Sequence, residues 1–153
     1  MSENVSGAQS QRRAEPRQYS TFFVDGLYFG VDVLNVQEVL KHQEMTPVPK
    51  AHGVITGLIN LRGQIVTAFD MRRRLGVSPP QTAKPSMNFV IRTEDGAVSL
   101  LVDEIGDVIE VRQEDFEPPP KTVSEVGREV IEGVYKLDGR LLLVLSTKRV
   151  LQT

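Results

Sequence analysis

The stretch GVITGLINLRGQIVTAFDMRRRLG, residues 53–76, decides the fold. Two short apolar runs flank the pair Arg62-Gly63 and predict a β-hairpin with strands near residues 55–61 and 64–69. The turn is unusual because a long cation precedes its glycine, where Asn or Asp is more common. Arg62 is therefore either a tolerated surface residue or a residue that something outside the chain uses.

A short helix is expected directly after this hairpin. Asp70 is a good N-cap, residues 71–75 would form the helix, and Gly76 suits the position after its end. Arg72, Arg73 and Arg74 lie on this helix, where cations near the C-terminus favour the helix dipole. They also leave open a second interpretation, a small β-barrel that binds nucleic acid through these arginines and Arg62.

Composition excludes several classes of protein. The chain has 153 residues, enough for one domain or two small ones, and its formal net charge of −2 argues against general binding to nucleic acid or anionic membrane. The absence of cysteine excludes disulfides and thiolate chemistry. No apolar run approaches the roughly 20 residues of a membrane-spanning helix, and we see no secretory signal. We expect a soluble cytoplasmic protein.

Proline and glycine divide the chain into short strands. Residues 1–16 are polar and are expected to be a disordered lead-in to a folded region over residues 17–153. Residues 77–86 contain three prolines and read as a linker between two modules, roughly 17–80 and 85–151, between which strands are exchanged. Residues 114–127, EDFEPPPKTVSEVG, are expected to form a long loop.

The two modules share an internal repeat. When residues 54–75 are shifted by 76 positions they lie on residues 130–151, and the helix caps Asp70 and Ser146 then correspond. A weaker match joins VDVLNVQEV to VDEIGDVIEV. Many short strands and few helices predict two small β-barrels that share an interface. The identical pairs are Val54/Val130, Ile55/Ile131, Gly57/Gly133, Leu61/Leu137, Gly63/Gly139, Arg73/Arg149 and Leu75/Leu151.

The repeat provides a control for Arg62. The equivalent turn is Asp138-Gly139, a pair favoured in type I′ turns, so turn geometry accounts for the glycines and not for Arg62. Val36 and Glu38 form a second candidate pair, because residues i and i+2 of a strand share a face. Glu38 would then be the polar rim of an apolar contact; alternatively, Val36 is buried and Glu38 bends outward.

No cluster of reactive side chains indicates an enzyme, a cofactor or a metal site. The histidines, His42 and His52, have a spacing that fits no tight metal pair, and no cysteine assists them. We find no glycine-rich phosphate loop and no nucleophile elbow. We therefore expect no catalytic residues, no metal ligands and no cofactor.

Several segments together resemble the CheW family of bacterial chemotaxis adaptors. They are YFGVDVLNVQEVL, TPVP, GLINLRGQIVTAFDMRRRLG, LLVDEIGDVIEV and DGRLLLVL, in an order that agrees with the family over residues 18–151. The resemblance implies an all-β fold of two intertwined five-stranded SH3-like β-barrels with short closing helices. It also implies a non-enzymatic scaffold that couples the cytoplasmic tips of methyl-accepting chemoreceptors to the regulatory domain of a CheA-type histidine kinase.

The resemblance also implies where the partners bind. Such an adaptor is cytoplasmic, is recruited to membrane-associated receptor arrays, and meets the membrane only through receptors. An adaptor of another chemosensory pathway, controlling motility, pili or biofilm, would fit the same residues. The implied receptor-binding residues are Val33, Val36, Glu38, Arg62 and Val108, and the implied kinase-binding residues are Met45, Thr46, Pro47, Val48, Phe116 and Glu117.

Overall fold

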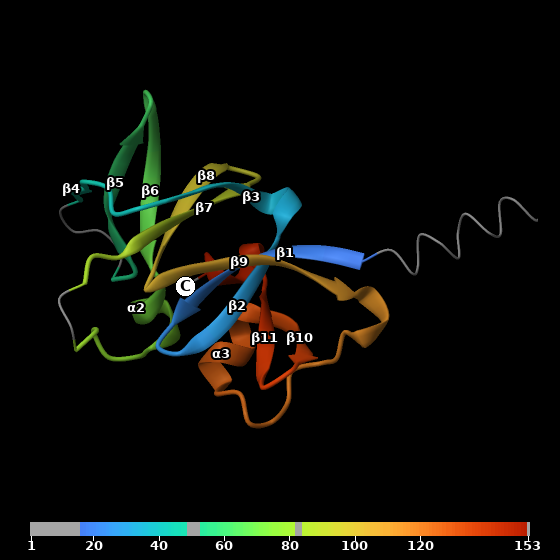
Figure 1. Ribbon diagram of the computed structural model, residues 1–153. Helices are drawn as coiled ribbons and strands as arrows, with labels where there is room; N and C mark the ends of the chain where they lie inside the picture. The colour runs from blue at the N-terminus through green and yellow to red at the C-terminus, as the bar shows by residue number, and fades with distance from the viewer. Residues whose placement is uncertain (1–15, 49–52, 82–83, 153) are drawn as a thin grey trace, which may run out of the picture.

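The computed structural model describes residues 16–48, 53–81 and 84–152, and its fold is all-β with short helices (Figure 1). The expected lead-in lies outside the described residues apart from Pro16, which begins the first strand. The elements are β1 (Pro16–Val24), β2 (Leu27–Asp32), η1 (Val33–Asn35), β3 (Val36–Leu40), β4 (Thr46–Pro47), β5 (Ile55–Leu61), β6 (Gln64–Asp70), α2 (Met71–Leu75), β7 (Met87–Thr93), β8 (Gly96–Val102), β9 (Glu104–Arg112), η2 (Gln113–Asp115), α3 (Glu125–Val130), β10 (Ile131–Leu137), β11 (Arg140–Leu145) and α4 (Thr147–Val150).

Two sheets contain these strands, and each sheet takes strands from both halves of the sequence. The β1 sheet has the order β10-β11-β2-β1-β9, and the β5 sheet has the order β3-β7-β8-β6-β5-β4. The hairpin β1–β2 therefore joins strands from the C-terminal half, and the hairpin β7–β8 joins strands from the N-terminal half. In both sheets this hairpin lies next to a parallel partner, β11 beside β2 and β6 beside β8.

The internal repeat reappears as matching geometry. Asp70 and Ser146 cap α2 and α4, accepting hydrogen bonds from the backbone N–H groups of Arg73 at 3.2 Å and Arg149 at 3.1 Å. The register of β5 with β6 shifts between Ile55 and Gly57, and that of β10 with β11 shifts between Ile131 and Gly133. These bulges lie 76 residues apart, as the sequence repeat requires.

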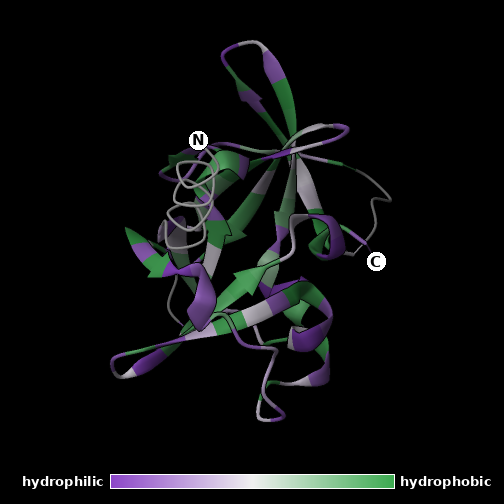
Figure 2. Ribbon diagram, turned by 90° about the vertical axis from the view of Figure 1, so that its right-hand side faces the viewer, coloured by the Kyte–Doolittle hydropathy of each residue, from purple (hydrophilic) through white to green (hydrophobic). Residues whose placement is uncertain are grey.

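Among the residues that the structure describes, three apolar clusters form the core. The largest lies between the sheets and includes Phe22 and Phe29 from the β1 sheet and Phe89 and Leu100 from the β5 sheet, all fully buried. Each sheet also curls around a smaller cluster of its own, one containing Tyr19 and the other containing Ile59, Val66 and Val90. Figure 2 shows hydrophilic residues at the tips of the long hairpins and apolar residues along the central strands. The two curled sheets therefore share one interface.

The all-β expectation is confirmed, with two differences of detail. In the described part of the chain the strand ladders do not close into complete rings; an isolated pair, Glu117 with Val134, links the segment after β9 to β10. The loop expected over residues 114–127 contains the start of α3, because the Ser124 side chain accepts a hydrogen bond from the backbone N–H of Gly127 at 3.1 Å and caps the helix.

Candidate interaction surface

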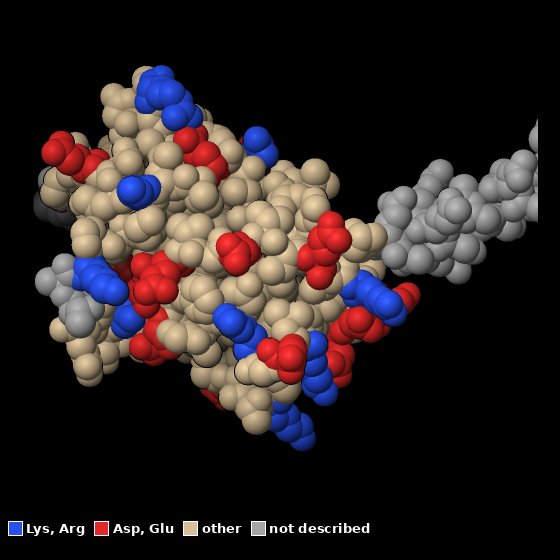
Figure 3. Space-filling model, viewed as in Figure 1, with Lys and Arg blue, Asp and Glu red and all other residues tan. Residues whose placement is uncertain are grey.

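The edge strands β3 and β9 flank the exposed side of the cluster between the sheets. Val36 from β3 and Ile105 from β9 both pack against this cluster. A hollow of about 660 Å³ lies between the end of β3, the start of β7 and the start of β9, with Met87 and Ile105 in its wall. We call the surface between β3 and β9 the inter-sheet groove. Figure 3 shows separate acidic groups among uncharged surface across the face that carries β3 and β9.

Val36 and Glu38 do not share a face, contrary to the expectation for a regular strand. Val36 pairs with Ile91 and Glu38 pairs with Val90, so β3 contains one extra residue between them. Paired residues of antiparallel strands share a face, and a bulge therefore turns the following side chain to the opposite side. Val36 faces the cluster between the sheets, whereas Glu38 faces the barrel of the β5 sheet.

The bulge brings Glu38 to Arg62. The Arg62 guanidinium donates a hydrogen bond to the Glu38 carboxylate and forms an ion pair with it, with 72% of the Arg62 side chain and 19% of the Glu38 side chain exposed. The hydrogen bond from Arg62 is the main cause that lowers the pKa of Glu38, and it raises the pKa of Arg62. The equivalent positions in the second module are the acidic residues Glu110 and Asp138, so the repeat has no such pair there.

The backbone at Arg62 departs from what the residue type favours. Arg62 has φ 52° and Gly63 has φ 88°, which makes this a type I′ turn. In the described part of the chain the non-glycine residues with positive φ are Asp25 and Arg62. The sequence predicts a type I′ turn at Asp138-Gly139, but Asp138 lacks the positive φ that this turn type requires, so that prediction is wrong. A long side chain thus occupies a left-handed position that Asn, Asp or Gly would take more readily.

Val33 and Val108 lie farther along the same edges. Val33 begins the 3₁₀ turn η1, which Asp32 caps through a 2.9 Å hydrogen bond from the backbone N–H of Leu34. Val108 on β9 pairs with Ser20 on β1 and is 58% exposed. The structure therefore joins Glu38 and Arg62 directly, and it places Val36 and Val108 on the two strands that flank the inter-sheet groove.

The residues expected to bind the kinase form two equivalent edge segments. Thr46 pairs with Leu58 at one sheet edge, and Glu117 pairs with Val134 at the other. Leu58 and Val134 correspond under the 76-residue repeat, so Met45-Thr46 corresponds to Phe116-Glu117.

The sequence carries a signal for this relation at an offset that differs from the 76 positions of the main repeat. A shift of 71 places MTPVPK, residues 45–50, on FEPPPK, residues 116–121, with two prolines and a lysine identical. The triple proline of the second module thus has a counterpart. We call residues 45–48 and residues 116–117 the paired edge segments.

Both paired edge segments pass close to a bulge glycine. A Cβ atom at Gly57 would lie 2.6 Å from the Thr46 carbonyl oxygen, and a Cβ atom at Gly133 would lie 2.4 Å from the Glu117 carbonyl oxygen. Phe116 is 39% exposed, and its ring meets that of Tyr135 edge-on at 5.3 Å between centroids. The glycines allow the segments to pair closely, and Phe116 remains available to a partner.

The arginines of α2 are engaged within the chain. Arg72 donates to the Asp103 carboxylate at 2.9 and 2.7 Å and to the Ser78 carbonyl oxygen at 2.6 Å. Arg73 donates to the Gly53 carbonyl oxygen at 3.0 Å, and Arg74 donates to the Val150 carbonyl oxygen at 2.9 Å. These contacts use the cations that a nucleic-acid interface would need.

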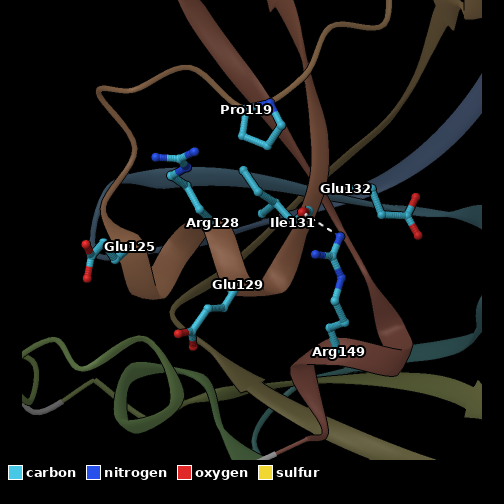
Figure 4. Close-up of a pocket in the computed structure, with 7 residues that line it drawn as sticks. All are labelled: Pro119, Glu125, Arg128, Glu129, Ile131, Glu132 and Arg149. Atoms are coloured by element: carbon cyan, nitrogen blue, oxygen red, sulfur yellow. Dashed lines mark hydrogen bonds between the residues drawn. The ribbon is translucent and has the colours of Figure 1, made fainter.

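No group of side chains in the described segments has the arrangement of a metal centre. His42 lines the 660 Å³ hollow, and His52 lies outside the described residues. Figure 4 shows another hollow, of about 380 Å³, where Glu125, Glu129 and Glu132 point away from one another and Arg149 donates to the Ile131 carbonyl oxygen at 2.8 Å. In the described part of the chain, no helix is long and apolar enough to cross a membrane.

A family model for the CheW-like domain matches residues 18–153. The chain belongs to the CheW family. The resemblance seen in the sequence is therefore confirmed, and with it the expectation of a chemotaxis adaptor. The individual binding residues remain predictions.

Two relatives and one solved structure show the extent of the similarity to CheW proteins. The chemotaxis protein CheW of Bacillus subtilis is 32% identical over 130 residues, covering 85% of this chain and 83% of the relative. The chemotaxis protein CheW of Treponema pallidum is 31% identical over 136 residues, covering 86% of this chain and 80% of the relative. The crystal structure of the scaffolding protein TtCheW from Thermoanaerobacter tengcongensis matches with a TM-score of 0.81 and 27% identity, covering 91% of this chain and 94% of that one.

Proposed function

We propose that this chain is a cytoplasmic chemotaxis adaptor that joins the tips of methyl-accepting receptors to a CheA-type histidine kinase. The observation that carries the proposal is the CheW-like match over residues 18–153, together with two separate surfaces of the kind that a two-partner scaffold needs. The chain acts by binding and performs no chemistry of its own. It reaches receptor arrays, and hence the membrane, through its partners.

The inter-sheet groove is the receptor site in this proposal. A receptor tip is a helical hairpin, and an amphipathic helix fits an apolar groove through side chains spaced by helical turns. Val36 and Val108 supply apolar flanks, with Val33 at one end. Arg62 and Glu38 lie beside them as a fixed charge pair, which sets the register of the bound helix more than its affinity.

The paired edge segments are the kinase site. Met45 to Val48 and Phe116-Glu117 lie at equivalent places on the two barrels, so one chain presents two similar surfaces to kinase regulatory domains. Exposed Phe116 has the character of an aromatic anchor. Modest contacts at each surface would be reinforced by the effective concentration within an array.

Receptor binding is tested best with Val108→Asp. Val108 is largely exposed, so its substitution spares the core, whereas Val36 packs against buried residues. We expect Val108→Asp to weaken binding of a receptor-tip fragment about tenfold or more in a titration, because a charge would be buried against the apolar stripe of the helix. Val126→Asp, at an exposed position of α3, is the matched control and should bind normally. Equal binding by the wild-type protein and a folded Val108→Asp variant would remove Val108 from the site.

Kinase binding is tested with Phe116→Ala. We expect weaker binding of the CheA regulatory domain with receptor-fragment binding unchanged, because the two surfaces share no residue. Arg112→Ala, an exposed residue just before η2, serves as the control. If Phe116→Ala has a normal melting temperature and yet loses binding to both the kinase domain and the receptor fragment, the two partners do not use separate surfaces.

A further inference from the structure

Strand pairing reveals an approximate two-fold relation that exchanges β3 with β9. The hairpins β1–β2 and β7–β8 have the same register at an offset of 69 residues. At that offset Val36 on β3 matches Ile105 on β9, and each strand has its bulge directly after this residue. The sequence match of the two strands gives a larger offset; strand pairing matches Glu38 with Asp107, which is acidic as Glu110 is. The two strands run in opposite directions across one face (Figure 1).

The inter-sheet groove ends in two hollows that this relation exchanges. The 660 Å³ hollow lies at the end of β3, and a second hollow, of about 690 Å³, lies between η1, the end of β9 and the start of β1. We call them the β3-end hollow and the β9-end hollow. Because equivalent positions line both hollows, the backbone of the groove fits a helix lying in either direction. The lining residues that match at the offset of 69 are Lys41 with Glu110, Pro85 with Pro16, Met87 with Gln18 and Asp103 with Leu34.

The β3-end hollow has a surplus of positive charge. Its ionisable lining residues are Lys41, His42, Lys84, Asp103 and Glu104. The Asp103 carboxylate is already engaged, because it accepts hydrogen bonds from Arg72 at 2.9 and 2.7 Å. Within residues 16–48, 53–81 and 84–152, Lys41, Lys84 and Glu104 have no ion-pair partner. Two unpaired cations therefore face one unpaired acid at this end of the groove.

The β9-end hollow has a surplus of negative charge. Arg17 and Asp32 line it and form an ion pair with each other at 3.5 Å. Glu110 accepts a hydrogen bond from the neutral amide of Gln18 at 3.1 Å, and no cation pairs with it in the part of the chain that the structure describes. The unpaired charge here is opposite to that of the β3-end hollow, although the two hollows are equivalent in the fold.

We propose that these charges fix the direction in which a receptor-tip helix lies in the inter-sheet groove, an inference that rests on the receptor role proposed above. The acidic end of the helix lies over Lys41 and Lys84, and its basic end lies over Glu110. Since the groove is similar from both ends, charge complementarity decides between the two directions. Each exposed charge pair changes affinity by up to about fivefold, and reversal affects both ends at once, so we expect about a tenfold preference for one direction.

Two synthetic peptides test this direction without any receptor. Both are stapled helices with a leucine stripe and a nitroxide at the glutamate end; one has glutamates in its first turn and lysines in its last, and the other has the reverse order. Amide NMR of the full chain shows which hollow the nitroxide broadens. We expect both peptides to broaden the amides of Met87 and Ile105 rather than those of Gln18 and Leu34, because charge and not chain direction orients the helix.

The variant Lys41→Glu/Glu110→Lys exchanges the charges of two matched positions and keeps the net charge. We expect it to move the broadening from the β3-end hollow to the β9-end hollow. Lys148→Glu/Glu132→Lys makes the same exchange at exposed positions outside the groove and should leave the broadening where it is. The proposal is overturned if neither peptide gives saturable shifts in the groove, if both hollows broaden equally in the wild-type protein, or if the groove variant leaves the pattern unchanged.

A receptor-tip fragment separates this direction from the receptor role itself. We expect Lys41→Glu and Glu110→Lys each to weaken fragment binding about threefold at low salt, with the difference shrinking at high salt. If the peptides orient as expected but the wild-type protein does not bind the fragment, the receptor role fails and the direction set by the groove stands. If the fragment binds and neither substitution weakens it, these charges do not orient a receptor helix and the proposal is overturned.

Discussion

At the scale of single residues, Arg62 combines an unfavourable backbone with a specific partner. Its positive φ suits Asn, Asp or Gly, and yet the position holds an arginine whose guanidinium is bound to Glu38. The ion pair ties the tip of the β5–β6 hairpin to β3, on the face of β3 that is turned towards the barrel of the β5 sheet. The residue is therefore better explained by its charge than by its turn.

Arg62→Asn separates these two roles. We expect this variant to melt at the same temperature as the wild-type protein or slightly higher, because Asn adopts the left-handed conformation with less strain, and this gain offsets the loss of a largely exposed ion pair. We expect it to bind a receptor-tip fragment more weakly, because the charge pair is lost. Thermal unfolding and a binding titration measure the two effects. Asp138→Asn in the sister hairpin is the control, and a large drop in stability for Arg62→Asn alone would indicate a structural role instead.

The ionisation of Glu38 reports the same contact. In the folded protein Arg62 holds the pKa of Glu38 below its ordinary value, so the pair stabilises the fold above the pKa of the unfolded state. That contribution is lost as the pH falls through the lowered folded-state pKa. Carboxyl-carbon NMR should show the pKa of Glu38 rising in Arg62→Asn. An unchanged Glu38 titration would mean that the ion pair does not form in solution.

Arg62 could be singled out from the sequence because the repeat places Asp138 at the equivalent position. The direction in which its partner Glu38 points could not be predicted from the sequence. The expectation that Val36 and Glu38 share a face assumed a regular strand period of two. The extra residue in β3 is set by pairing with β7, about fifty positions away in sequence, and no local pattern reveals it. The direct pairing of Glu38 with Arg62 follows from that bulge.

At the scale of elements, the capping residues in the sequence predicted the helices α2 and α4. They did not predict the start of α3 or the close pairing of segments at Gly57 and Gly133. The caps Asp70 and Ser146 and the αL residue Gly76 all act as their types suggest. The stretch at residues 114–127 was expected to be a loop throughout because of its prolines, but Ser124 caps a helix that begins at Glu125. The role of Gly57 and Gly133 depends on the distant segments that pair against them, which sequence spacing does not show.

Gly133→Ala tests whether the paired edge segment depends on close approach at the bulge. The new methyl group would meet the backbone of Glu117 and the ring of Phe116, and we expect a loss of about 1–3 kcal/mol of unfolding free energy, the usual cost of overpacking. Denaturant unfolding measures it. Gly53→Ala is the control, since a Cβ atom there meets no heavy atom within 4 Å. Equal stability of the two variants would show that the segment at residues 116–117 is not closely packed.

At the scale of the whole molecule, exchange of hairpins between the two halves makes the barrels depend on each other. The β1–β2 hairpin pairs with β9 and β11, and the β7–β8 hairpin pairs with β3 and β6. Arg72 adds a polar link by joining α2 to Asp103. Burial raises the pKa of Asp103, but hydrogen bonds from Arg72 and from the Asp25 backbone N–H outweigh it and hold that pKa below its ordinary value. The composition and the turn residues predicted two barrels. The pairing of individual strands could not be predicted in the same way, because it depends on contacts between residues far apart in the sequence.

Splitting the chain tests this interdependence. We expect fragments 1–82 and 83–153 to be unfolded when separate, because each lacks the partner strands of its own hairpin. Mixed in equal amounts, they should give a folded complex with the dispersed NMR spectrum of the intact chain. A stable fold in either fragment alone would contradict the interdependence of the two barrels.

The central claim is that this chain joins a kinase to receptors, and co-sedimentation measures it most directly. Receptor-bearing membranes are mixed with the CheA-type kinase, with or without the chain, and the kinase in the pellet is measured. We predict that the kinase sediments with the membranes only when the chain is present, and that Val108→Asp and Phe116→Ala each reduce this recruitment while Val126→Asp does not. Equal sedimentation of the kinase with and without the chain would contradict the account.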